Sequence, residues 1–243
     1  MTERIPTCRL ADLPAETPPV IARAMEAVFG DRVPMPETLQ LSGTGRTSVT
    51  LGFIKTGLSL RVAFTYDFPD RQVGEFADRV RWDSAVTFLR MLVGAVTQAF
   101  DGEVGYQKVG TRDLLSDARM TESLRRRLWA ESIALLFPLV GLKLDVRDET
   151  DHSAVLVSED GDPVILEFDP ADGRPISVTY ERFQEDLDRY VTVTLELGRV
   201  KVVDSLPVLS PVHTSVEGTL LNGYKIEGVA VNPSLDDVGF VLR

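Results

Sequence analysis

The two histidines are the first residues to consider for chemistry, because histidine is the side chain that titrates nearest to neutral pH. His152 and His213 are the only histidines in the 243-residue chain. They fall in different predicted strands or turns, and neither has a partner at metal-ligand spacing. Asp148, Glu149 and Asp151 surround His152 and could hold a cation, but such a cluster is more typical of an exposed acidic turn. We therefore expect no metal site here.

A second group of acidic residues could bind calcium if its spacing were right. The group consists of four aspartates, Asp160, Asp162, Asp169 and Asp172. Their spacing does not follow the EF-hand loop, and aspartate next to glycine is common in turns. The aspartates therefore predict turns rather than a calcium site.

Other catalytic motifs are not found in the sequence. Glu185 and Asp186 could act as an acid–base pair, but one sequence does not distinguish them from solubilising charge. The chain has no Gly-Xaa-Ser-Xaa-Gly elbow, no Walker loop and no zinc-peptidase motif. We expect no cofactor and favour a protein that binds rather than catalyses.

Charge and cysteine content restrict the classes of partner. The net charge of −11 argues against nucleic acid, whose phosphates need a basic surface. Arg125 to Arg127 and the pair Arg79 and Arg81 are basic clusters, but they lie among acids and are interpreted as solvated faces. Cys8 is the only cysteine, which excludes an internal disulfide. No apolar run reaches the roughly 20 residues of a membrane span, and the first residues lack the apolar stretch of a signal peptide.

Large apolar side chains are the feature that points to binding. Seven of them could line a site between a curved sheet and an apolar helix end: Phe53, Phe64, Phe88, Leu92, Trp129, Leu136 and Phe137. Each taken alone is more simply a core residue. As a set they allow a helix to cover the mouth of an incompletely closed barrel, and such a mouth is a natural apolar ligand site.

The elements that would position these side chains follow from the hydrophobic period. Residues 1–19 are rich in proline and charge and predict an N-terminal arm, and residues 20–243 predict one domain. Helices are expected at 19–29 and at 116–136, each ended by a glycine or proline. Residues 76–100 fit either a helix or strands.

The remaining segments alternate with the period of strands. Period-two alternation predicts strands between residues 38 and 66 and again over 142–231. Asp101-Gly102, Asp160-Gly161, Asp172-Gly173 and Asn222-Gly223 predict hairpin turns. The fold class is therefore α+β, with an antiparallel meander in the C-terminal half.

The order of these signals resembles a known family. Leu39-Gln-Leu-Ser-Gly-Thr-Gly-Arg46 follows a short helix, and Phe100-Asp-Gly-Glu-Val-Gly-Tyr106 precedes a helix rich in leucine and arginine. Leu166-Glu-Phe-Asp-Pro-Ala-Asp-Gly173 and Val203-Asp-Ser-Leu-Pro207 come later. Together they resemble the LolA/LolB lipoprotein carriers and their uncharacterised lipoprotein-sorting-like relatives, over about residues 20–243. Tyr106 stands where relatives often have tryptophan, and Ser205 where they have glycine.

The resemblance implies a strongly curved, open antiparallel sheet (a half barrel) whose helices cover the concave face and enclose a cavity for acyl chains. It also implies a periplasmic or envelope location, with a lipid or other apolar molecule as ligand and an envelope protein as a further partner. The lack of a signal peptide leaves the cytoplasm as the alternative. Three hypotheses follow in order: a carrier of an apolar ligand, a structural or interaction module with a filled cavity, and an unrecognised hydrolase with His152 or His213 as base.

Overall fold

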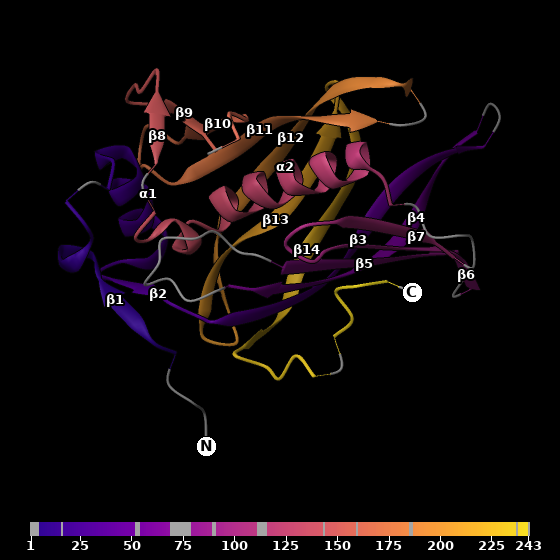
Figure 1. Ribbon diagram of the computed structural model, residues 1–243, viewed down its shortest axis with the longest axis horizontal. Helices are drawn as coiled ribbons and strands as arrows, with labels where there is room; N and C mark the ends of the chain where they lie inside the picture. Colours follow the sequence, from indigo (N-terminus) through magenta and orange to yellow (C-terminus); the bar gives the residue numbers. More distant parts are fainter. Residues whose placement is uncertain are drawn as a thin grey trace.

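The computed structural model describes residues 5–15, 17–51, 54–68, 79–88, 91–110, 116–142, 144–158, 160–184, 187–236 and 238–242. Figure 1 shows a long sheet that passes on both sides of one helix, α2 (Ala118–Leu135). A second helix, α1 (Pro19–Phe29), lies at one end with a two-stranded sheet of β1 (Thr7–Arg9) and β2 (Arg32–Pro34). Two short 3-10 helices follow Arg9 and Leu136, at Leu10–Asp12 and Phe137–Leu139.

The main sheet has twelve strands within the described residues, in the order β7-β6-β5-β4-β3-β14-β13-β12-β11-β10-β9-β8. Every neighbouring pair is antiparallel. The first five strands in the chain are β3 (Thr38–Leu51), β4 (Ile54–Asp67), β5 (Arg79–Phe88), β6 (Met91–Phe100) and β7 (Gly105–Val109). After α2 follow β8 (Asp145–Arg147), β9 (Ser153–Val157), β10 (Pro163–Phe168), β11 (Pro175–Gln184), β12 (Arg189–Val203), β13 (Leu206–Val216) and β14 (Thr219–Val231).

The sheet curves around α2 without closing. Strands from both ends of the order, β6 and β7 on one side and β11 on the other, contact this single helix. Within the described residues the edge strands β7 and β8 do not pair with each other, so the half barrel stays open. The predicted fold class, an open antiparallel sheet with a helix over its concave face, is confirmed.

Alternation along the strands explains which face is buried. Successive residues of β10 alternate between exposed and buried, and β12 follows the same rule over most of its length. The buried set forms one core with the inner faces of both helices. The segment 76–100, which fitted either a helix or strands, contains β5 and β6, so its β-branched residues outweighed its helical period.

Local capping explains where the second helix begins and ends. Asp117 has extended backbone and accepts a hydrogen bond from the amide of Met120, at 2.7 Å, which satisfies one free donor of the first turn. The helix ends at Leu136, whose φ of 62° turns the chain away before Pro138. The predicted limits of this helix are confirmed to within two residues.

Three of the four predicted hairpin turns are confirmed. Gly102, Gly161 and Gly173 take positive φ between β6 and β7, β9 and β10, and β10 and β11. In the turn at Asp101 and Gly102, burial acts to raise the pKa of Asp101. The amides of Val104 and Glu103 and the hydroxyl of Tyr106 donate to its carboxylate and lower its pKa below the ordinary value.

The fourth predicted turn is wrong. Asn222 and Gly223 lie inside β14, and the β13–β14 turn is made by Glu217 and Gly218 at positive φ. Gly223 is needed for another reason, since a Cβ there would stand 2.3 Å from the ring of His213 on the neighbouring strand. Glycine allows the close approach, and the sequence pattern does not distinguish this use from a turn.

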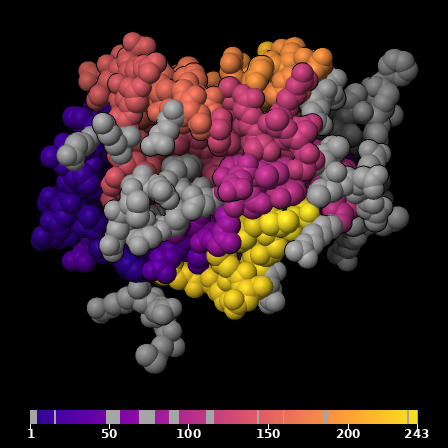
Figure 2. Space-filling view, viewed as in Figure 1, coloured from indigo at the N-terminus to yellow at the C-terminus, as the bar shows by residue number. Residues whose placement is uncertain are grey.

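Described residues close to each end of the sequence pack onto the domain. Leu10 and Leu13, from the predicted N-terminal arm, contact the core. The boundary between arm and domain at residue 19 stays a prediction. At the other end, Arg81 on β5 donates to the carbonyl of Gly239, and the Arg79 guanidinium lies 5.0 Å from the ring centre of Phe240. Figure 2 shows the C-terminal segment, in yellow, on the surface beside the magenta part of the chain.

Across the residues that the structure covers, neither α1 nor α2 is long and apolar enough to span a membrane.

Candidate functional site

A cavity of about 230 Å³ lies between α2 and the concave face of the sheet. Its walls come from β3–β6 on one side and β11–β14 on the other, with α2 as the cover. The apolar part of the lining consists of Leu60, Val62, Phe64, Val86, Val96, Val193, Leu195 and Leu221. A second cavity of about 50 Å³ shares Phe64, Glu131, Leu195 and Tyr224 with it and is otherwise lined mainly by aliphatic side chains.

The α2 face toward these cavities carries an ion pair. Arg127 and Glu131 are four residues apart and so lie one above the other on the helix. The Arg127 Nε donates to Glu131 Oε1 at 2.8 Å, and its Nη1 donates to Gln98 Oε1 at 2.6 Å. Both side chains line the larger cavity. The pair therefore places charge against a mostly apolar wall.

Two aromatic residues of the sheet complete the environment of this pair. Trp82 Nε1 donates to Glu131 Oε2 at 2.5 Å, and the Tyr66 hydroxyl donates to the same oxygen at 2.8 Å. The Arg127 guanidinium lies 4.4 Å from the centre of the Trp82 ring. Glu131 thus accepts three hydrogen bonds, which offset the cost of burying its polar atoms.

Burial and nearby charges raise the pKa values of three tyrosines and one arginine at the site. Burial, together with the nearby Glu131 carboxylate, raises the pKa of Tyr66 well above its ordinary value. Burial raises the pKa of Tyr224 and Tyr180 as well. For Arg127, burial is the largest single effect and lowers the pKa, but the Glu131 carboxylate together with Tyr180 and Tyr66 outweighs it, so the pKa is raised. The three tyrosines are therefore neutral near pH 7, Tyr66 donates a hydrogen bond to Glu131, and Arg127 is a permanent cation.

Arg182 brings a second cation to the cavity. It lies on β11, two residues beyond Tyr180, so both side chains point to the concave face. Its Nε is buried and has no hydrogen-bond partner. Asn222 on β14 also lines the cavity, and its Oδ1 is buried without a partner. The wall therefore offers polar atoms that the protein itself does not satisfy.

The structure brings only part of the predicted apolar set to these cavities. Phe64 lines both of them. Trp129, Leu136 and Phe137 are buried in the core and are not among the described residues that line either cavity. Phe137 packs edge-on against Phe68 instead, with ring centres 5.4 Å apart.

The other three predicted residues are not described in enough detail to place. Phe53 lies outside the described residues, as do the side chains of Phe88 and Leu92, whose backbones belong to β5 and β6. The assignment of the seven residues as ligand contacts stays a prediction.

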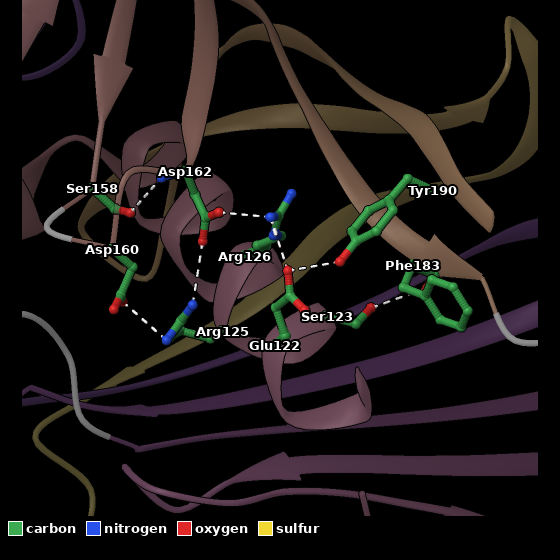
Figure 3. Close-up of polar contacts among 9 residues, drawn as sticks. All are labelled: Glu122, Ser123, Arg125, Arg126, Ser158, Asp160, Asp162, Phe183 and Tyr190. Atoms are coloured by element: carbon green, nitrogen blue, oxygen red, sulfur yellow. Dashed lines mark hydrogen bonds and ion pairs between the residues drawn. The ribbon is translucent and has the colours of Figure 1, made fainter. Parts of the chain in front are cut away.

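The opposite face of α2 is held to the sheet by charged contacts, shown in Figure 3. Arg126 pairs with Asp162 at 2.8 Å and with Glu122 at 2.8 Å, and Arg125 pairs with Asp160 at 3.1 Å and with Asp162 at 3.5 Å. Both aspartates flank Gly161 in the β9–β10 turn. We call these five residues the α2 clamp.

Further contacts hold the first turns of α2 to the β11–β12 hairpin. Tyr190 donates to Glu122 at 2.8 Å, and Ser123 donates to the carbonyl of Phe183 at 3.3 Å. Arg119 pairs with Asp188 at 2.9 Å. The first half of α2 is therefore attached to one half of the sheet, and Arg127 and Glu131 attach the helix to the other half.

The expectation that Arg125 to Arg127 form a solvated face is wrong. Arg126 and Arg127 have side chains only 18% and 20% exposed, and both are ion-paired. The sequence showed that acidic residues were near these arginines, but not that Arg126 and Arg127 lie on different sides of one helix. The i,i+4 spacing of Arg127 and Glu131, on the same side as Ala134 and Leu135, was the available signal.

The histidines lie apart from these cavities. His152 is exposed in the turn before β9. His213 on β13 is partly exposed, with its Nδ1 3.9 Å from Glu196. Neither lines the two cavities among the described residues.

The geometry defines a class of protein: an open antiparallel sheet wrapped around one helix, with an internal cavity. Among solved structures, the chain is similar to a LolA superfamily protein from Nitrosomonas europaea, with 9% identity over 90% of this chain and 94% of that one, and a TM-score of 0.47. It is similar to a DUF1329 family protein from Desulfovibrio piger, with 10% identity over 91% and 94% and a TM-score of 0.48.

A third similar structure is a domain from Vibrio parahaemolyticus described as outer-membrane lipoprotein-sorting, with 8% identity over 84% and 88% and a TM-score of 0.47. The similar structures thus include LolA-type proteins, as the sequence motifs indicated. No family model and no curated protein matches the sequence.

Proposed function

We propose that this chain is a non-catalytic binding or carrier protein that holds a lipid, an acyl chain or another apolar molecule between α2 and the sheet. The observation that carries the proposal is the cavity of about 230 Å³ left beneath the helix. Small-molecule sites commonly measure roughly 300–1,000 Å³, so the space approaches the lower end of that range. A filled interface, as a purely structural module would need, leaves no such space.

The apolar walls explain why a ligand would be favoured. Leu60, Val193 and Leu195 point into the cavity from opposite halves of the sheet. Side chains that border a void lose dispersion contacts on that side, and an apolar chain placed there restores them. Ligand binding should therefore stabilise the folded state.

Thermal unfolding with dodecanoic acid, below its micelle concentration, tests the proposal. A ligand present at 100 times its Kd stabilises the fold by about 2.7 kcal/mol. For a chain of this size that corresponds to a rise in Tm of roughly 5–10 °C. Native mass spectrometry should show one bound ligand per chain.

Two variants on β12 provide the matched comparison. Leu195→Trp fills the cavity, whereas Val202→Trp places the same side chain at a position that is 66% exposed. Binding should be lost in the first and kept in the second. Equal binding by both variants, or no binding by the unmodified chain, would contradict the proposal.

The proposed location is the periplasm or another part of the cell envelope, where an envelope protein would exchange the ligand. The sequence motifs shared with LolA/LolB carriers support this location. Fractionation of the producing cells with detection of the full-length protein checks it. Recovery in the cytoplasmic fraction alone would remove the exchange partner from the proposal.

A further inference from the structure

Arg182 is a charged residue of the cavity lining that has no ion-pair partner among the described residues. Its side chain lines the cavity, its Nε is buried, and no acceptor meets that atom. Within the part of the chain that the structure describes, no carboxylate forms an ion pair with it. A buried guanidinium nitrogen without an acceptor is costly, and an oxygen of a ligand in the cavity would satisfy it.

The two carboxylates that line the same cavity are already engaged. Glu131 pairs with Arg127 at 2.8 Å and accepts from two aromatic side chains. Asp83 pairs with Arg81 at 2.8 Å and accepts from the Thr97 hydroxyl at 2.7 Å. Each carboxylate of the lining is therefore paired with an arginine, Glu131 with Arg127 inside the lining and Asp83 with Arg81 outside it, and Arg182 is left as the lining cation without an ion pair.

Asn222 is a further polar residue of the lining, on a strand separated from that of Arg182 by β12 and β13. Its amide lies on β14, and its Oδ1 is buried without a partner. This oxygen is an acceptor, so it requires a hydrogen-bond donor such as a hydroxyl and does not itself bind an anion. The apolar walls of Val193 and Leu195 begin on the neighbouring strand of Arg182.

From this arrangement we infer that the ligand is an amphiphile with an acidic head group, a carboxylate or a phosphate, which Arg182 binds while the chain lies along the apolar wall. The inference rests on the proposed function and makes it more specific. Guanidinium groups bind both kinds of oxyanion through two parallel hydrogen bonds. Losing a hydrogen bond to a charged group should weaken binding roughly ten- to a hundred-fold.

Three probes with the same chain test the inference: dodecanoate, dodecyl phosphate and 1-dodecanol. We expect the unmodified protein to bind one or both anions at least tenfold more tightly than the alcohol, as measured by isothermal titration or by native mass spectrometry. Dodecanoate and dodecyl phosphate distinguish a fatty acid from a phosphate-bearing lipid as the source of the head group.

Substitution of the arginine locates the preference. Arg182→Gln should reduce affinity for the anions to that for the alcohol, and Arg182→Lys should keep part of the preference. Arg199→Gln, an exposed position on β12, is the control and should leave all three affinities unchanged. If Arg182→Gln does not fold, the ratio of anion to alcohol binding in the unmodified and Arg182→Lys proteins decides the question.

The possible failures are distinguishable. Equal binding of anion and alcohol by the unmodified protein overturns the head-group inference and leaves the proposed function intact. A preference that survives Arg182→Gln overturns the role of Arg182. If none of the three probes binds, both the inference and the proposed function are overturned.

Discussion

Substitution of Asp162 should loosen α2 from the sheet. Asp162 pairs with two arginines of the α2 clamp, and its side chain is only 12% exposed. Asp162→Asn keeps the shape and removes the charge. Arg126 would retain Glu122 as a partner, at 2.8 Å, but would lose its more buried contact.

The expected loss follows from burial. Removing one partner of a fully buried ion pair costs about 3–5 kcal/mol. Because Arg126 keeps Glu122, and Asn still accepts a hydrogen bond, we expect Asp162→Asn to lower the free energy of unfolding by about 2 kcal/mol. Asp160, two residues away, is 51% exposed and pairs with an arginine that is 40% exposed. Solvent screens that pair, so Asp160→Asn should cost less than about 1 kcal/mol.

Urea unfolding measures both values. The fluorescence of Trp82 and Trp129 follows the transition, since both residues are buried and Trp129 is part of α2. Circular dichroism should give the same midpoints if the helix and sheet unfold together. If the two variants had equal stability within about 0.5 kcal/mol, the assignment of α2 anchoring to Asp162 would be refuted.

Three further predictions concern the helix, its contact with β7 and the first hairpin. Glu131→Leu or Arg127→Met alone should cost roughly 3 kcal/mol in urea unfolding, whereas the double variant should cost less than the sum, because it leaves no buried charge unpaired. Gly105→Ala should lower the free energy of unfolding by about 1–3 kcal/mol, because its Cβ would lie 2.8 Å from the α2 backbone. Gly94→Ala on β6 has open space around the new Cβ and should be neutral or slightly stabilising. Equal effects of the two substitutions would contradict this account. Asp101 has a lowered pKa despite its partial burial, so its contribution to stability is present above about pH 4 and is lost as the pH falls through the folded-state pKa. The unmodified protein should be more stable than Asp101→Asn by less than about 1 kcal/mol, because solvent reaches the carboxylate. When unfolding is measured at a series of pH values, this difference should disappear as the pH is lowered. A difference that does not change with pH would contradict the prediction.

Much of the fold was predictable from local signals. Alternation in strands such as β10 and β12, and the capping aspartate of α2, act over a few residues and are visible in the sequence. Asn222 and Gly223 show where this fails. Gly223 is required because the ring of His213 on the neighbouring strand lies close to its backbone, and this contact follows only from the pairing register of the two strands.

The sequence indicated an apolar site but not the charged residues that line it. Large apolar residues indicated a core or a cavity, and Phe64 does line the cavity. The charged part was missed because Arg127 and Arg182 are ordinary surface residues by type, and burial gives them their significance. Burial of Arg182 depends on the curvature of a sheet assembled from distant segments.

Quenching of single tryptophans by 12-bromododecanoic acid tests the central claim most directly. Trp82 lines the cavity beneath α2, and Trp129 is buried outside the described linings of both cavities. In Trp129→Phe, which keeps only Trp82, the brominated chain should quench most of the fluorescence, with saturation at one ligand per chain. In Trp82→Phe the quenching should be small. Equal quenching of the two variants, or none in either, would contradict binding between α2 and the sheet.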